Sequence, residues 1–179
     1  MKGVILAGGK GSRLSPITDN YPKQLIPVLG KPILFHCIEH MKKVDIVEIC
    51  IVLSPETGKT IEKAISNSQF EGVNFTYIYQ DEPRGLAHAI GVTRDFIADD
   101  DFMVLLGDNL FDKSLDLLIE NFKKTQADSL ILLKEVDSPY QFGVVKFDAN
   151  GKAEKLVEKP KEFVSNYAIV GVYLFNTKI

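Results

Sequence analysis

A short apolar strand that runs directly into a glycine-rich loop constrains this chain more than any other feature. The strand comprises residues 4–6, and the loop follows as Ala7-Gly8-Gly9-Lys10-Gly11-Ser12-Arg13-Leu14. Three glycines in four positions leave backbone N–H groups uncovered, so an anionic group can approach them closely. Arg13 and Lys23 add positive charge beside the loop. We therefore predict an anion-binding loop; a plain turn with solvated basic residues is the alternative.

Neither of the two common phosphate-binding motifs is present. The dinucleotide fingerprint needs a third glycine where Leu14 follows Gly9 and Gly11. The mononucleotide motif needs a glycine five residues before Gly58-Lys59-Thr60, where the chain has Leu53, and Pro55 interrupts the segment. The predicted anion-binding loop is therefore of a different kind.

Composition excludes several classes of protein. The 179 residues are enough for one domain with a substantial core, and the net charge of -3 argues against a nucleic-acid-binding protein. No apolar run approaches the ~20 residues that a membrane-spanning helix needs. Because the chain starts directly with a strand, we expect no signal peptide. Cys37 and Cys50 lack paired spacing, which predicts free thiols in a reducing cytoplasm.

Hydrophobic patterning predicts alternating strands and helices in the first two-thirds of the chain. Such alternation indicates an α/β/α sandwich with a mostly parallel sheet in a single domain over residues 1–179. Asn150-Gly151 between two alternating segments predicts a hairpin, and hence a mixed sheet toward the C-terminal end. The expected strands are 4–6, 47–53, 74–79, 102–106, 129–133, 143–147, 155–157 and 169–175, and the expected helices are 31–43, 57–68, 87–98 and 115–125.

Ligands of open α/β sheets bind beyond the carboxyl ends of the strands. This rule places three loops, 8–13, 80–85 and 107–109, on one edge of the predicted sheet. Asp108 follows a buried strand there, and a carboxylate beside bound phosphates suits Mg²⁺. A turn or a helix cap is the alternative role for this aspartate.

Two further motifs have weaker signals. Glu158-Lys159-Pro160 follows a strand, where a lysine can meet a phosphate and a carboxylate can accept hydrogen bonds from hydroxyls. Pro160 should keep Lys159 out of the helical region, and a solvated ion pair is the simpler interpretation. The run from His36 to His40 matches the spacing of an inverted zinc-protease motif, but it has no visible third ligand and lies on a helix that already packs.

These residues resemble the sugar-1-phosphate nucleotidyltransferases. The resemblance rests on ordered motifs along the whole chain, with the segments at Gln80 and at Ser165 to Tyr173 favouring the glucose-1-phosphate thymidylyltransferase subgroup. Ser12, His88 and Phe142 depart from the usual threonine, glutamine and tyrosine. The motifs are Leu6 to Leu14, Pro22-Lys23-Gln24-Leu25, Gln80 to Ala87, Gly107-Asp108-Asn109, Phe142-Gly143-Val144-Val145, Glu158-Lys159-Pro160 and Ser165-Asn166-Tyr167-Ala168.

The resemblance implies a Rossmann-like nucleotidyltransferase fold. It also implies a reaction in which dTTP or UTP and a sugar 1-phosphate give a nucleoside diphosphate sugar and pyrophosphate. Mg²⁺ would be held by Asp108, and Arg13, Lys23 and Asp108 would be the catalytic residues. The other implied residues are Leu6, Ala7, Gly8, Gly9, Gly11, Ser12, Gln80, Pro83 and Gly85 for the nucleotide, and Leu86, Asn109, Gly143, Glu158, Lys159, Ile169 and Tyr173 for the sugar phosphate.

Members of this family usually continue for some hundred residues, with a second metal-binding aspartate and subunit contacts. We therefore expect an N-terminal portion or a truncated member that binds nucleotide and catalyses weakly or not at all. A non-catalytic domain that binds nucleotide or sugar nucleotide is the alternative, and a cytidylyltransferase is a weaker one. The sequence leaves the sugar, the choice between dTTP and UTP, and assembly into a homo-oligomer open.

Overall fold

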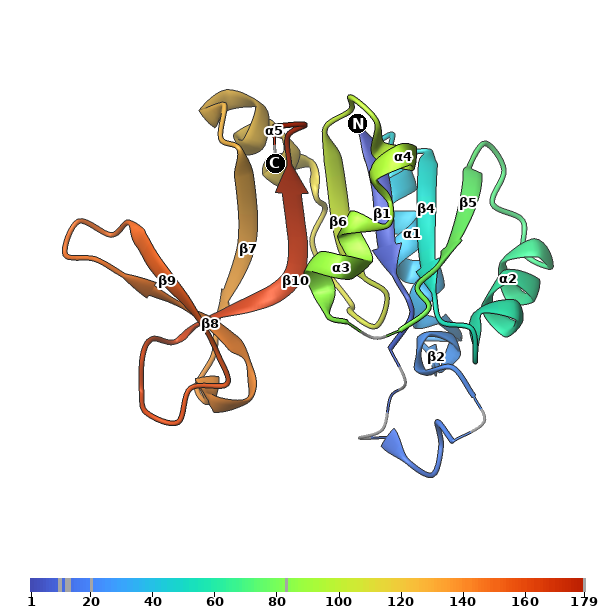
Figure 1. The fold of residues 1–179 in the computed structure, drawn as a ribbon, viewed down its shortest axis with the longest axis horizontal. Helices are drawn as coiled ribbons and strands as arrows, with labels where there is room; N and C mark the ends of the chain where they lie inside the picture. Colours follow the sequence, from blue (N-terminus) through green and yellow to red (C-terminus); the bar gives the residue numbers. More distant parts are fainter. Residues whose placement is uncertain (10, 12–13, 20, 83, 179) are drawn as a thin grey trace. The chain divides into compact units, whose positions relative to one another are not determined.

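The computed structural model describes the chain except for residues 10, 12–13, 20, 83 and 179 (Figure 1). The chain divides into two compact units. The first unit comprises Met1–Leu130 and Tyr173–Ile179, and the second comprises Ile131–Val172.

The first unit is built on a sheet of four parallel strands to which part of a fifth strand is added. Its order is β5 (Asn74–Tyr79), β4 (Glu48–Leu53), β1 (Lys2–Leu6) and β6 (Phe102–Leu106), followed by the C-terminal end of β10 (Tyr167–Phe175). β1 lies at the centre, with Val4 opposite Cys50 on β4 and opposite Val104 on β6. Because helices cover both faces, β1, β4 and β6 are nearly continuous apolar runs, whereas β5 at the edge of the sheet alternates between exposed and partly buried residues.

Helices pack on both faces of this sheet, as Figure 1 shows. On one face, α3 (Leu86–Gly91) and α4 (Arg94–Ile97) bury Ala89 and Ile97 in a cluster with Val4 and Phe102. On the other face lies α1 (Ile33–Lys43), whose Met41 is so close to Gly3 that an added Cβ would meet its sulfur at 2.5 Å. This confirms the predicted α/β/α architecture.

The remaining elements of the first unit are short or peripheral. They are the 3-10 helix η2 (Lys23–Leu25), the antiparallel pair β2 (Pro27–Val28) and β3 (Lys31–Pro32), α2 (Gly58–Ser66) and α5 (Asp116–Thr125). No helix in the described part of the chain is long and apolar enough to cross a bilayer.

The second unit contains the predicted hairpin. β8 (Gly143–Phe147) and β9 (Ala153–Glu158) pair antiparallel, and their turn is stabilised by Asp148, whose Oδ1 accepts the backbone N–H groups of Asn150 and Lys152 at 2.8 Å each. Gly151 in this turn has a φ of 76°. β8 also pairs antiparallel with β10, which pairs with β7 (Ser129–Glu135), so the sheet is mixed as predicted.

The predicted helix over residues 87–98 is wrong in one respect, because the structure has two helices there. α3 ends at Gly91 and α4 begins at Arg94. The fully buried Thr93 turns its hydroxyl back to donate to the Ile90 carbonyl at 2.7 Å. Glycine and a back-bonding threonine both weaken a helix, which explains the break.

The other predicted elements are confirmed, with small shifts at their ends. No end shifts by more than two residues; α1, for example, begins at Ile33 because Lys31 and Pro32 pair in β3 instead.

Candidate functional site

The carboxyl end of β1 is clamped between its two neighbouring strands. The Ala7 N–H donates to the Val52 carbonyl at 2.8 Å, and the Gly107 N–H donates to the Leu6 carbonyl at 3.0 Å. The predicted glycine loop therefore starts at the same edge of the sheet as the loop after β6. The predicted Ser12 and Arg13 lie outside the described residues.

Lys23 and Asp108 form an ion pair at this edge. Lys23 comes from η2 and Asp108 from the turn after β6, so the contact joins residues 85 positions apart. The Lys23 side chain is 23% exposed and that of Asp108 is 33% exposed, so both charged groups remain accessible to a ligand. An added Cβ on Gly9 would lie 3.0 Å from Lys23 Cε and 3.2 Å from Nζ. A side chain at this position would therefore displace the flexible end of the lysine where it passes over the loop.

Gln24 supports the glycine loop from the protein interior, a role that the sequence did not predict. Its side chain is only 1% exposed, and its Nε2 donates to the Gly9 carbonyl at 3.3 Å. Its Oε1 is buried and has no hydrogen-bond partner among the described residues. Its position directly after Lys23 in the Pro22–Leu25 motif was the available signal. We expect that Gln24 fixes the Gly9 backbone rather than contacting a ligand.

Side chains of α1 hold the segment that carries Asp108. The fully buried Cys37 directs its thiol to the carbonyls of Asn109, at 3.3 Å, and Leu106, at 3.7 Å. His40 Nε2 donates to the Phe111 carbonyl at 3.0 Å. Burial, with a smaller contribution from the Asp108 charge, raises the pKa of the Cys37 thiol to about 12, so it stays protonated and can donate.

The residues from His36 to His40 that match the inverted zinc-protease spacing have protein partners in the structure. His36 Nε2 donates to the Val28 carbonyl at 2.9 Å, and Glu39 pairs with Lys31 at 2.6 Å. Burial lowers the pKa of His40, which favours its neutral form. No group of three or more metal-ligating side chains occurs among the described residues.

Gln80 is fixed at the carboxyl edge by its backbone and by its side chain. Its N–H donates to the Leu53 carbonyl at 2.8 Å, at the end of β4. Its Nε2 lies 2.7 Å from His88 Nδ1 and 3.5 Å from the Gly85 carbonyl oxygen. Gly85 has a φ of 94°, a conformation that favours glycine. Leu86 follows as the exposed first residue of α3, while Pro83 lies outside the described residues.

Four of the predicted sugar-phosphate residues lie in the second unit, and three of them, Gly143, Glu158 and Ile169, meet there. Gly143 is paired with Glu158 across the β8–β9 ladder. A Cβ on Gly143 would lie 3.0 Å from Glu158 Oε2 and 3.5 Å from Ile169 Cδ1, so the glycine leaves room for that carboxylate. Lys159 is held in the left-handed region, with a φ of 43°, and its N–H donates to the Phe142 carbonyl at 3.0 Å. It is outside the right-handed helical region, as the following proline predicted.

The other predicted sugar-phosphate residues belong to the first unit. Asn109 lies in the turn after β6, and Tyr173 stacks on Phe175 with ring centroids 6.3 Å apart. Leu86 has been placed at the start of α3. The predicted set is thus divided between the two units.

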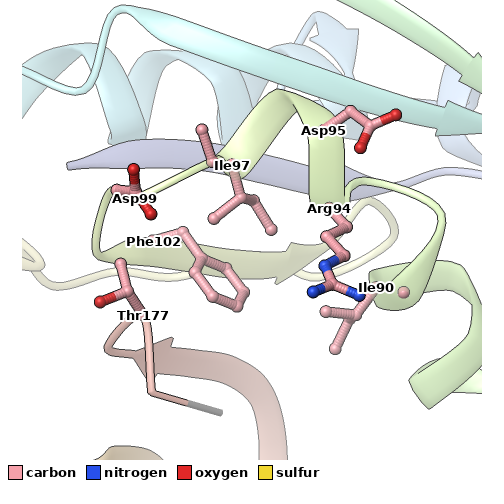
Figure 2. A pocket seen from close by; sticks show the side chains of 9 residues that line it. Ile90, Arg94, Asp95, Ile97, Asp99, Phe102 and Thr177 are labelled. Atoms are coloured by element: carbon pink, nitrogen blue, oxygen red, sulfur yellow. The ribbon is translucent and has the colours of Figure 1, made fainter.

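A pocket of about 680 Å³ lies away from this edge, at the opposite end of β6 (Figure 2). Phe102, the first residue of β6, lines it together with Ile90, Arg94 and Thr177. None of the predicted site residues contributes to it, so we do not assign it to the site.

The sequence of the chain matches a known family over almost its whole length. Residues 2–179 match the family described as "Nucleotidyl transferase". The chain belongs to this nucleotidyl transferase family. The glycine loop, Lys23 and Asp108 are therefore found in a chain that belongs to a family of nucleotidyl transferases.

Curated relatives carry names for more than one nucleotide. A "Low-salt glycan biosynthesis nucleotidyltransferase Agl11" of Haloferax volcanii is 42% identical over all of this chain and 50% of its own length. A "Glucose-1-phosphate thymidylyltransferase" of Streptomyces griseus is 38% identical, over all of this chain and 50% of its own length. A "UTP--glucose-1-phosphate uridylyltransferase AglF" of Haloferax volcanii is 36% identical, over all of this chain and 73% of its own length. The chain thus spans about half the length of the first two relatives.

Solved structures share the fold. A crystal structure from Bacillus anthracis, of a protein assigned to glucose-1-phosphate thymidylyltransferase and in complex with a sucrose, has a TM-score of 0.93 at 40% identity. It is matched over 99% of this chain and 72% of that chain. A UDP-glucose pyrophosphorylase complexed with UDP-glucose has a TM-score of 0.84 at 26% identity, over 98% of this chain and 75% of that chain. These likenesses confirm the predicted nucleotidyltransferase fold.

Proposed function

We propose that this chain carries the nucleotide-binding and transfer site of a sugar-1-phosphate nucleotidyltransferase. The reaction would join a nucleotidyl group from dTTP or UTP to a sugar 1-phosphate such as glucose 1-phosphate, and release pyrophosphate. The observation that carries the proposal is the Lys23–Asp108 ion pair beside the glycine loop, in a chain of this family. The names of the relatives support both nucleotides and a glucose 1-phosphate acceptor.

The chemistry of such a transfer suits these residues. The attacking group is a phosphate oxygen that is already ionised at neutral pH, so no general base is needed. The barrier comes from repulsion between two anions and from charge that develops at the α-phosphorus, so positioning and fixed positive charge lower it. Lys23 would supply such a charge and the glycine loop would supply N–H groups, with Arg13 assigned by resemblance alone.

Mg²⁺ is part of this proposal. Asp108 offers an accessible carboxylate at the strand end, and Mg²⁺ is commonly bound by one or two carboxylates together with substrate phosphates. The donor set therefore fits a cation shared with a triphosphate rather than one enclosed by protein. When bound, the cation would neutralise phosphate charge. In our proposal, Lys23 leaves Asp108 and turns to the phosphates as the substrate arrives.

We assign the sugar phosphate to the second unit. The space above Gly143 is bounded by the Glu158 carboxylate, which can accept hydrogen bonds from sugar hydroxyls. Lys159, whose Nζ lies 3.4 Å from Glu158 Oε1, provides the counter-charge for the phosphate. We also propose a cytoplasmic location, which is supported by two free, buried cysteines.

The test compares Lys23→Ala with Lys31→Ala. Lys31 also pairs with a carboxylate, and its side chain is similarly half-buried, but it lies outside the proposed site. Pyrophosphate release from dTTP or UTP with glucose 1-phosphate and Mg²⁺ is measured together with nucleotide affinity. Loss of a charge-assisted contact predicts at least a tenfold fall in turnover for Lys23→Ala and no change for Lys31→Ala.

Two results would count against this proposal. Equal turnover in both variants would remove Lys23 from the site. Nucleotide binding without pyrophosphate release by the unaltered chain would favour a non-catalytic binding domain instead. A thermal-shift series with dTTP, UTP, dTDP-glucose and UDP-glucose identifies the preferred nucleotide, because a ligand of the folded chain raises its apparent stability.

A further inference from the structure

We infer that His88 determines base specificity by fixing the orientation of the Gln80 side-chain amide. The inference rests on the proposed function, in which Gln80 contacts the base of the nucleotide. In the sequence, His88 stands out only as a departure from the glutamine that is usual at this position.

Two neighbours determine which end of the amide faces the protein. The Gly85 carbonyl, 3.5 Å from Gln80 Nε2, can only accept a hydrogen bond. His88 Nδ1 lies 2.7 Å from the same nitrogen. An amide rotated by half a turn would place its oxygen against the carbonyl oxygen. The nitrogen therefore faces inward, and His88 must accept through an unprotonated Nδ1.

The surrounding backbone holds these partners in place. The Gln80 N–H is bonded to the Leu53 carbonyl at 2.8 Å, which anchors it to β4. The Gly85 carbonyl also accepts the Ala89 N–H at 3.1 Å, and Ala89, next to His88, is buried in the core. Both the glutamine and the histidine are thus anchored to the sheet and to α3, while their side chains stay partly exposed.

This arrangement has a consequence for the base that can bind. With Nε2 held by His88, Gln80 Oε1 is the atom left to a ligand, and it can only accept a hydrogen bond. Uracil and thymine carry a donor at N3, whereas N3 of cytosine is itself an acceptor. The fixed amide therefore favours uracil and thymine over cytosine. Without His88 the amide can rotate and present its nitrogen to cytosine.

The test measures the affinities of UTP and CTP, which differ only in the edge that Gln80 would contact. His88→Leu fills the space without an acceptor, whereas His88→Asn places an amide oxygen near the position of Nδ1. Isothermal titration calorimetry on the 179-residue chain should show a preference for UTP that falls about fivefold in His88→Leu, the factor expected for one net hydrogen bond. His88→Asn should retain the preference.

A double-mutant cycle separates this role from simple packing. In a Gln80→Leu background, His88→Leu should leave the ratio of UTP to CTP affinity unchanged, because no amide remains to be oriented. The inference would be overturned if the His88→Leu single variant kept the ratio of UTP to CTP affinity of the unaltered chain. It would also be overturned if His88→Asn lost as much of the preference for UTP as His88→Leu does. If Gln80→Leu itself leaves the ratio intact, or if neither nucleotide binds, the assignment of the base site in the proposed function fails as well.

Discussion

Serine substitutions at the two cysteines should have very different costs, although both side chains are fully buried. Cys37 faces the carbonyls of Leu106 and Asn109, which can accept a hydroxyl proton. Cys50 lies on β4 in a cluster of apolar side chains that includes Val4 and Val104. A serine hydroxyl therefore finds partners at position 37 and an apolar environment at position 50.

The magnitude follows from the cost of an unpartnered hydroxyl. Burying one without a hydrogen bond costs roughly 1–3 kcal/mol, whereas a hydrogen bond that is made contributes roughly 0.5–1.5 kcal/mol. We expect Cys50→Ser to be about 2 kcal/mol less stable than Cys37→Ser. For a chain of this length that difference corresponds to a melting temperature lower by about 4–8 °C.

Urea denaturation followed by circular dichroism measures the difference, and the two alanine variants provide the control. Alanine removes the sulfur and adds no polar group, so Cys50→Ala should be more stable than Cys50→Ser. At position 37 the order should be reversed, because alanine loses the donor that serine keeps. Equal stability of the two serine variants, or the same order at both positions, would refute the assigned role of the Cys37 thiol.

Three further predictions concern the loops and the effect of pH. Gly9→Ala should weaken triphosphate affinity, measured by calorimetry, because its Cβ meets the end of Lys23 at 3.0–3.2 Å. That end of the lysine is flexible, so the free energy of unfolding should change by less than about 1 kcal/mol. Gly107→Ala should cost roughly 1–3 kcal/mol in urea denaturation, because its Cβ would lie 3.1 Å from the Leu6 carbonyl oxygen, which cannot move; a smaller loss would show that the strand end is loosely packed. Burial raises the pKa of both thiols from 9.0 to about 12, so the folded chain binds more protons than the unfolded chain between these values. The contribution of the thiols to stability should be constant below pH 9 and fall above it, by up to about 1.4 kcal/mol per thiol and pH unit, and a variant without cysteines should show a shallower decline in denaturation experiments from pH 8 to 11.

Local patterns in the sequence were sufficient for the architecture. The apolar runs that became β1, β4 and β6 indicate strands buried on both faces, and alternation with helices then implies a parallel sheet. Once the sheet is parallel, the loops after these strands must share one edge. The position of the glycine loop, Gln80 and Asp108 on that edge follows from topology alone.

Contacts between distant residues were decided only by the tertiary structure. The pairing of Lys23 with Asp108 depends on where η2 lies against the end of β6, which no local pattern encodes. His36 and His40 show the same limit: the sequence disfavoured a metal site because no third ligand was visible, but only the structure shows their partners, the carbonyls of Val28 and Phe111.

The glycine loop shows which of its properties the sequence determines and which the tertiary structure determines. Its sequence determined that backbone N–H groups are exposed after a strand, because residues without a Cβ cannot cover them. The fold determined what surrounds them: Lys23 over Gly9, and Gln24 bonded to the Gly9 carbonyl from within the core. Backbone conformation is a local property that side-chain types reveal. The sequence already predicted Lys23 beside this loop, but only packing brings it over Gly9 and pairs it with Asp108.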